Sequence, residues 1–163
     1  MATGQRLTLW ALIALAVVVL DQACKWLAVA ALADGGIVLV PGLADLVLVY
    51  NKGAAFGILS DTAYGRWLLV GLTVVALAVA AWLAVGGKSG GRPGMLVCIS
   101  LISGGAVGNL IDRVRLGQVI DFLYLHAGQY YWPAFNLADA AITCGGVALA
   151  WQLFRGERGK AAD

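Results

Sequence analysis

Four apolar runs, separated by short polar segments, dominate the pattern of residues along the chain. They cover residues 7–33, 67–85, 94–111 and 133–154, and each is close to the roughly 20 residues that a helix needs to cross a bilayer. The first run continues past its polar residues, Asp21, Gln22 and Lys25, so we expect it to stay in the protein and not to be a removable signal peptide. The pattern therefore predicts an all-α polytopic membrane protein with four transmembrane helices.

The segment between the first two runs, residues 35–66, has a different pattern. It contains two short β-like runs, at residues 37–40 and 46–50, separated by Pro41 and Gly42. We expect these runs to form a small extracytoplasmic β-sheet on the membrane surface. Residues 113–132 are rich in aromatic side chains that favour the membrane interface, and we expect an outer loop there. With no repeat or linker, residues 1–163 are expected to form a single integral membrane domain.

The composition agrees with a membrane protein. The chain is 61% hydrophobic and 12% charged, with a mean hydropathy of +0.87, whereas a soluble domain is roughly half apolar and about a quarter charged. A net charge of +2 with no long basic stripe gives little support to nucleic-acid binding. The three cysteines lie far apart in apolar surroundings and His126 is the only histidine, so we expect no metal and no cofactor.

The basic residues predict the orientation of the helices. Six of the eleven lysines and arginines lie in the two tails and in the loop between the second and third runs. These six are Arg6, Lys88, Arg92, Arg155, Arg158 and Lys160. Because short cytoplasmic segments carry an excess of Lys and Arg, we expect both termini in the cytoplasm and residues 35–66 and 113–132 on the outer side.

Polar residues on three of the predicted helices fall at one depth. With a rise of 1.5 Å per residue, Asp21 and Asn109 lie roughly 21 and 22 Å from the cytoplasmic ends of their runs. Asp139 lies about 9 Å below the outer end of its run, in a core about 30 Å thick. Asp139 has no basic residue within four positions, so it needs a partner from another segment. Asp121, just beyond the third run, is a candidate.

These polar residues also have purely structural interpretations. Asp21 and Lys25 are four residues apart on one helix face and can form an intramembrane ion pair. Arg113 can anchor a helix end at the lipid headgroups. Asn109 and Asn136 can join helices by hydrogen bonds, and small residues in the third run can allow close helix packing.

Two neighbouring aspartates favour hydrolysis by acid–base catalysis. Such a pair shares one proton, so the ionised member can activate a water while the protonated member donates to a scissile amide. Two alternatives stay open. Intramembrane aspartates and lysines also line the paths of ion- or proton-coupled transport proteins, and a non-catalytic assembly factor can use polar residues to hold helices together. The apolar cytoplasmic halves of the runs argue against transport.

Five short motifs, in this order along the chain, resemble those of the bacterial lipoprotein signal peptidase family, also called signal peptidase II. They are Asp21-Gln22-x-x-Lys25, NKGAAFG at residues 51–57, GGAVGNLIDR at 104–113, VIDF at 119–122 and FNLAD at 135–139. Each string alone is weak, but five in order on four spans are specific. The resemblance covers essentially the whole chain.

The resemblance implies an aspartic endopeptidase of the bacterial inner membrane that removes signal peptides from diacylglyceryl-modified prolipoproteins, cleaving before the lipid-modified cysteine. It implies Asp121 and Asp139 as the catalytic residues. Residues implied to bind substrate or support the site are Asp21, Lys25, Asn51, Gly53, Gly105, Asn109, Arg113 and Asn136. The outer sheet and a loop or helix lid would cover a site near the periplasmic face. Contacts with membrane lipid, inhibition by globomycin and no obligate protein partner are expected.

Overall fold

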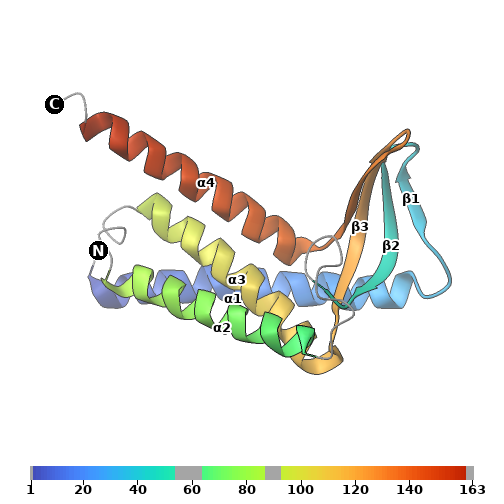
Figure 1. The fold of residues 1–163 in the computed structure, drawn as a ribbon, viewed down its shortest axis with the longest axis horizontal. Helices are drawn as coiled ribbons and strands as arrows, with labels where there is room; N and C mark the ends of the chain where they lie inside the picture. Colours follow the sequence, from blue (N-terminus) through green and yellow to red (C-terminus); the bar gives the residue numbers. More distant parts are fainter. Residues whose placement is uncertain (1, 54–63, 87–92, 161–163) are drawn as a thin grey trace.

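The computed structural model describes residues 2–53, 64–86 and 93–160. Its four helices are α1 (Thr3–Ala31), α2 (Gly65–Gly86), α3 (Pro93–Leu116) and α4 (Leu137–Lys160). All four are long and apolar enough to cross a membrane, which confirms the predicted four-span, multi-pass membrane protein. In Figure 1 both termini lie at one end of the helical bundle and the β-strands lie at the other.

Helix α3 is the centre of the bundle and packs against each of the other three helices. Small residues make this possible, because they let helix backbones approach closely inside a membrane. A Cβ on Gly104 would meet the carbonyl oxygen of Ala14 and the Cβ of Val17, both on α1, at 2.7 Å. The small residues of the third apolar run are therefore explained by its central position.

The four strands form one antiparallel sheet in the order β1-β2-β3-β4. They are β1 (Ile37–Val40), β2 (Ala44–Asn51), β3 (Val119–Ala127) and β4 (Tyr130–Phe135). The predicted small sheet is confirmed, but the expectation of a loop over residues 113–132 is wrong. That segment contains the end of α3 and the β3–β4 hairpin, which turns at Gly128 with a φ of +61°. The first four residues of β3 are all buried, so the alternation typical of a surface strand is missing.

Several helix boundaries differ from the apolar runs, and the structure explains two of the differences. Helix α3 continues past Ile111 to Leu116, because Asp112 is buried against polar partners inside the protein. Helix α4 begins at Leu137 and not at Pro133, because Pro133 belongs to β4. Hydropathy alone does not separate a strand from the helix that follows it.

The sheet exposes a large apolar surface. All four side chains of β1 are exposed, and Tyr130, Tyr131 and Trp132 on the β3–β4 hairpin are between 61% and 84% exposed. Aromatic residues of this kind favour the membrane interface.

Some residues singled out in the sequence lie outside the described part of the chain. They are residues 54–57 of the second motif, Lys88 and Arg92, together with the side chains of Arg158 and Lys160.

Candidate active site

Asp139 is fixed by the way α4 begins. Asn136 directly precedes the helix, and its side-chain Oδ1 accepts the backbone N–H of Asp139 at 2.9 Å. In return, Asp139 Oδ2 accepts the backbone N–H of Asn136 at 3.2 Å. These reciprocal bonds satisfy two N–H groups that a helix start leaves free, in the manner of a capping box. Asp139 is the third residue of α4, so the depth of about 9 Å counted from Pro133 is wrong and the carboxylate lies at the helix end.

Asp121 lies on β3 and is 2% exposed. Its two carboxylate oxygens accept hydrogen bonds from two asparagines. Asn51 Nδ2, at the end of β2, donates to Oδ2 at 3.1 Å, and Asn136 Nδ2 donates to Oδ1 at 2.7 Å. Asn51 is itself held by the backbone N–H of Gly53, which donates to Asn51 Oδ1 at 3.0 Å. The predicted roles of Asn51 and Gly53 thus acquire a geometric basis.

Two amide side chains connect the two aspartates. Asn109 on α3 donates from Nδ2 to Asp139 Oδ1 at 2.8 Å. Its Oδ1 accepts a hydrogen bond from Asn136 Nδ2 at 3.1 Å, and Asn136 also reaches Asp121. A continuous polar chain therefore runs from Asp121 through Asn136 and Asn109 to Asp139.

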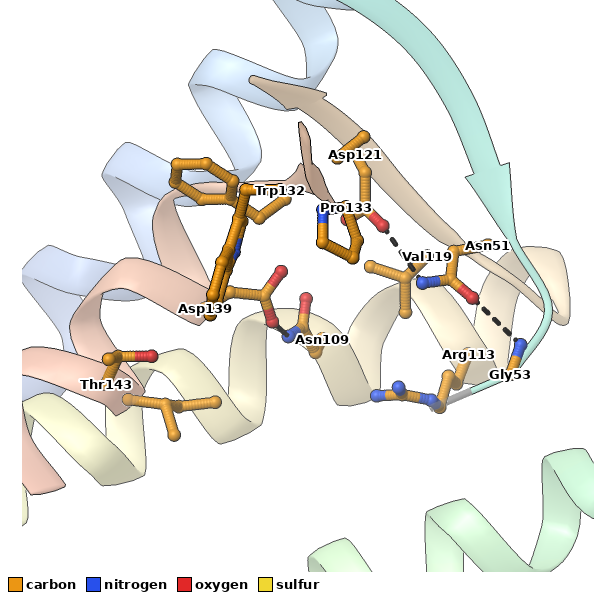
Figure 2. A pocket seen from close by; sticks show the side chains of 13 residues that line it. Asn51, Gly53, Asn109, Arg113, Val119, Asp121, Trp132, Pro133, Asp139 and Thr143 are labelled. Atoms are coloured by element: carbon orange, nitrogen blue, oxygen red, sulfur yellow. Dashed lines mark hydrogen bonds between the residues drawn. The ribbon is translucent and has the colours of Figure 1, made fainter. Parts of the chain in front are cut away.

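Both aspartates line a cavity of about 230 Å³. Residues of α3, α4 and strands β2, β3 and β4 contribute to its walls, as does Gly53 beyond β2. Figure 2 shows Asp121 and Asp139 on either side of this space, with Trp132 and Pro133 of β4 beside them and Arg113 projecting from α3. The three ion pairs among the described residues do not include Arg113. Arg113 contributes to the lining of the cavity.

Burial raises the pKa of Asp121 from its ordinary value of 3.8 to about 6. The hydrogen bonds from Asn51 and Asn136 oppose this shift, and the negative charge of Asp139 adds to it. A carboxyl group with a pKa of about 6 can hold or release a proton close to neutral pH, which general acid–base catalysis requires.

A buried charge cluster lies directly behind the cavity. The ammonium group of Lys25 lies 2.9 Å from Asp21 Oδ2 and 2.8 Å from Asp112 Oδ2. It also donates to Asn109 Oδ1 at 3.0 Å. Asp21 Oδ1 in turn accepts the backbone N–H of Ala138 at 2.9 Å, which ties α1 to the start of α4. Although the predicted depth of Asp139 was wrong, Asp21, Asn109 and Asp139 do come together: Asn109 bonds to both Lys25 and Asp139, and Asp21 accepts the backbone N–H next to Asp139.

Two members of this cluster, Gln22 and Asp112, were not among the site residues expected from the sequence. Asp112 pairs with Lys25, and Gln22 Nε2 donates to Asp112 Oδ1 at 3.0 Å. Both residues stand in the quoted motifs: Gln22 is three positions from Lys25, and Asp112 is three positions from Asn109. This spacing places the side chains on one helix face, and it is the feature of the sequence from which Gln22 and Asp112 could have been predicted as members of the site. Among the described residues, no three His, Cys, Asp or Glu side chains are grouped so that they can hold a metal ion.

Gly105 sets how closely α4 approaches α3. A Cβ on this glycine would overlap the carbonyl oxygen of Ala138, and it would lie 2.8 Å from Cγ1 of Ile142. We expect Gly105→Ala to push the start of α4 outward, to destabilise the fold by about 1–3 kcal/mol and to reduce activity, because Asp139 moves with α4. Thermal unfolding in detergent and an activity assay measure both effects.

Gly146→Ala is the matched control on α4. A Cβ on Gly146 meets nothing within 4 Å, and replacing a glycine inside a helix by alanine stabilises it by about 0.5–1 kcal/mol. If Gly105→Ala behaved like Gly146→Ala, the close approach of α3 and α4 would not be needed to place Asp139.

Comparison with known proteins agrees with the motifs. A model of the family described as signal peptidase (SPase) II matches residues 13–155. A lipoprotein signal peptidase of Cupriavidus taiwanensis is 49% identical over 142 residues, covering 86% of this chain and 80% of that protein. One from Burkholderia mallei is 41% identical over 159 residues, covering 97% and 95%. A solved structure of a bacterial membrane enzyme is 31% identical, with a TM-score of 0.83, and covers 94% of this chain and 92% of its own.

Proposed function

Because this chain belongs to the signal peptidase II family of membrane peptidases, we propose that it is an aspartic endopeptidase that removes signal peptides from diacylglyceryl-modified prolipoproteins. Asp121 and Asp139 are the catalytic residues in this proposal. The observation that carries it is the arrangement of these two carboxylates, which face one cavity and are joined by Asn136 and Asn109. Cleavage takes place before the lipid-modified cysteine.

The two aspartates have different surroundings, which supports different roles. Asp139 lies in the first turn of α4, where the helix dipole favours a negative charge. Asp121 has a pKa of about 6, raised mainly by burial, and so retains a proton more readily. In the proposed mechanism Asp139 takes a proton from a water whose oxygen attacks the scissile carbonyl, and Asp121 donates its proton to the carbonyl oxygen. The intermediate then collapses: Asp121 takes back a proton from one hydroxyl as the carbonyl re-forms, the C–N bond breaks, and Asp139 gives its proton to the nitrogen of the lipid-modified cysteine, which leaves as the amine.

The other expected site residues would bind the substrate or hold the two aspartates in place. Arg113 presents hydrogen-bond donors to substrate carbonyls or to a lipid headgroup. Asn51 and Gly53 hold Asp121 from the β2 side, and Gly105 lets α4 bring Asp139 close to α3. Asp21 and Lys25 support Asn109 and the start of α4 from behind.

The location of the cavity fits a substrate that is anchored by its own lipid. The cavity lies where the helices meet the sheet, at the end of the bundle opposite both termini (Figure 1). We propose that the whole chain acts as one domain in the bacterial inner membrane, with both termini in the cytoplasm and the cavity near the periplasmic face. Membrane lipid surrounds the helices, and the acyl chains of the substrate stay in the membrane while the peptide bond enters the cavity.

Incubation of the purified protein with a diacylglyceryl-modified prolipoprotein in detergent tests this function. We expect release of the signal peptide, with the new amino terminus at the lipid-modified cysteine, and inhibition by globomycin. Unmodified prolipoprotein serves as the matched control and should be cleaved poorly. Absence of cleavage, together with ion or proton flux in vesicles, would favour the alternative of a transport protein. Against transport, the buried charged side chains of the described helices are confined to Asp21, Lys25 and Asp112.

The raised pKa of Asp121 predicts how one substitution changes stability with pH. Between pH 3.8 and about 6 the unfolded chain ionises this group while the folded protein keeps the proton. The wild type therefore loses stability as the pH rises through this window, by about 3 kcal/mol. Asp121→Asn avoids this cost but loses the hydrogen bond from Asn51, which is worth about 1 kcal/mol.

We therefore expect the Asp121→Asn variant to be more stable than the wild type by about 2 kcal/mol at pH 7.5. The difference should disappear, or reverse by about 1 kcal/mol because of the lost hydrogen bond, near pH 3, which lies below the pKa of both states and leaves the wild-type carboxyl protonated in each. Thermal unfolding of both proteins in the same detergent at the two pH values measures it. Equal melting temperatures at pH 7.5 would show that the ionised carboxylate carries no cost in the folded protein.

A further inference from the structure

The first residues of β3, which include Asp121 and the preceding Ile120, have no partner on β4. Pairing with β4 runs from Ala127 opposite Tyr130 to Leu123 opposite Phe135, and no residue of the described β4 lies opposite Ile120. Two side chains replace the missing strand. The backbone N–H of Ile120 donates to Asp112 Oδ2 at 3.2 Å, and its carbonyl oxygen accepts a hydrogen bond from Asn136 Nδ2 at 3.2 Å.

The carboxylate of Asp112 is itself held firmly. It is 2% exposed, and the oxygen that accepts the Ile120 amide also lies 2.8 Å from the ammonium of Lys25. The other oxygen accepts a hydrogen bond from Gln22 at 3.0 Å. Hydrogen bonds between charged groups are stronger than neutral ones, so this acceptor does not rotate away from β3 without breaking an ion pair.

The ammonium of Lys25 is connected to both catalytic aspartates. An ammonium group has three donors, and those of Lys25 are directed to Asp21, Asp112 and Asn109. The route through Asn109 reaches Asp139 in one further hydrogen bond. The route through Asp112 reaches the backbone beside Asp121.

Resting on the function proposed above, we infer that Asp112 is a positioning residue for catalysis. Its carboxylate, fixed by Lys25 and Gln22, accepts the Ile120 N–H in place of a strand partner. It thereby holds the neighbouring Asp121 at the correct position relative to Asp139. Asp112 does not line the cavity, so its role does not include contact with the substrate. Its removal should reduce kcat and leave KM nearly unchanged.

Three substitutions at Asp112 test this role, with kcat and KM measured on a diacylglyceryl-modified prolipoprotein. Asp112→Leu removes the acceptor for the Ile120 amide but leaves Lys25 paired with Asp21, so the protein should fold. We expect kcat to fall about 10²-fold, the loss typical of a reacting group misplaced by about 1 Å. Asp112→Asn keeps an oxygen toward Ile120 and Lys25, and the amide of Gln22 can turn to accept from it. That variant should retain kcat within about fivefold.

Asp112→Ser covers the case in which the leucine variant does not fold. Its side chain is small and polar but too short to reach the Ile120 amide, so the same loss of kcat is expected. Asp45→Leu is the matched control on the same sheet. The Asp45 carboxylate pairs with His126 at 3.0 Å, away from the cavity lining, so kcat should not change.

The outcomes separate this inference from the proposed function. A wild-type protein that cleaves, together with a folded Asp112→Leu or Asp112→Ser variant that cleaves equally well, overturns the inference alone. Equal losses in the asparagine and leucine variants also overturn it, because positioning requires only an acceptor toward Ile120. A wild-type protein that releases no signal peptide contradicts the proposed function, and the role of Asp112 is rejected with it.

Discussion

Replacing Asp139 by asparagine is expected to reduce the rate of signal-peptide release by about 10³- to 10⁴-fold, to near background. General acid–base groups contribute rate factors of about 10² to 10⁴, and an amide cannot take a proton from water. The substitution should leave the fold intact. The asparagine oxygen can still accept a hydrogen bond from Asn109 Nδ2 or from the backbone N–H of Asn136, the two donors that Asp139 binds now.

Gel analysis of prolipoprotein cleavage in detergent measures this effect, with Asp121→Asn assayed in parallel and expected to be equally inactive. Asp45→Asn is the matched control. Asp45 lies on β2, in the same sheet as Asp121, and its carboxylate contacts His126. Thermal unfolding establishes that the inactive variants are folded. Robust cleavage by a folded Asp139→Asn protein would contradict the assignment of the two catalytic aspartates.

Replacing Lys25 by methionine is expected to destabilise the protein by about 3–5 kcal/mol, the cost of removing one partner from a buried ion pair. Lys25 is 1% exposed, and Asp21 and Asp112 at its ammonium are 0% and 2% exposed. Methionine fills a similar volume but supplies no charge and no donor. The two carboxylates would then face each other without a cation, and Asn109 Oδ1 would lose one of its two donors.

The melting temperature in detergent, compared with that of Lys52→Met, measures this loss. Lys52 is exposed, so its replacement should change stability little. A triple variant, Lys25→Met with Asp21→Asn and Asp112→Asn, should recover much of the stability, because no ionised group then remains buried in the cluster. A Lys25→Met protein that melts like Lys52→Met would show that the buried ammonium adds nothing to stability.

Much of the polar network could be anticipated from the sequence, since spacing along a helix determines which side chains share a face. Asp21 and Lys25, four residues apart, form the expected ion pair. Asn136 and Asp139, three apart, form the cap of α4. The apolar runs gave the number of spans because each helix must cover the bilayer thickness.

Contacts between distant segments could not be predicted in the same way. Asn51 reaches Asp121 only because β2 pairs with β3 in a register that sets Val49 opposite Asp121, and nothing near Asn51 in the sequence specifies that register. The bond from Ile120 to Asp112 depends on where β4 stops pairing. Residues 118–122 look extended in the sequence, but β3 was not predicted as a strand, because its first four residues are buried and lack the alternation of a surface strand.

The capping of α4 has a consequence for biosynthesis. Asp139 reaches its position only when Asn136 closes the first turn of α4 and Asp21 binds the Ala138 amide. The contact from Asp21 joins the first helix to the last, so it forms only after the intervening helices and strands have been translated. On the proposed assignment of Asp139, the nascent chain gains its peptidase activity only when its last helix has inserted.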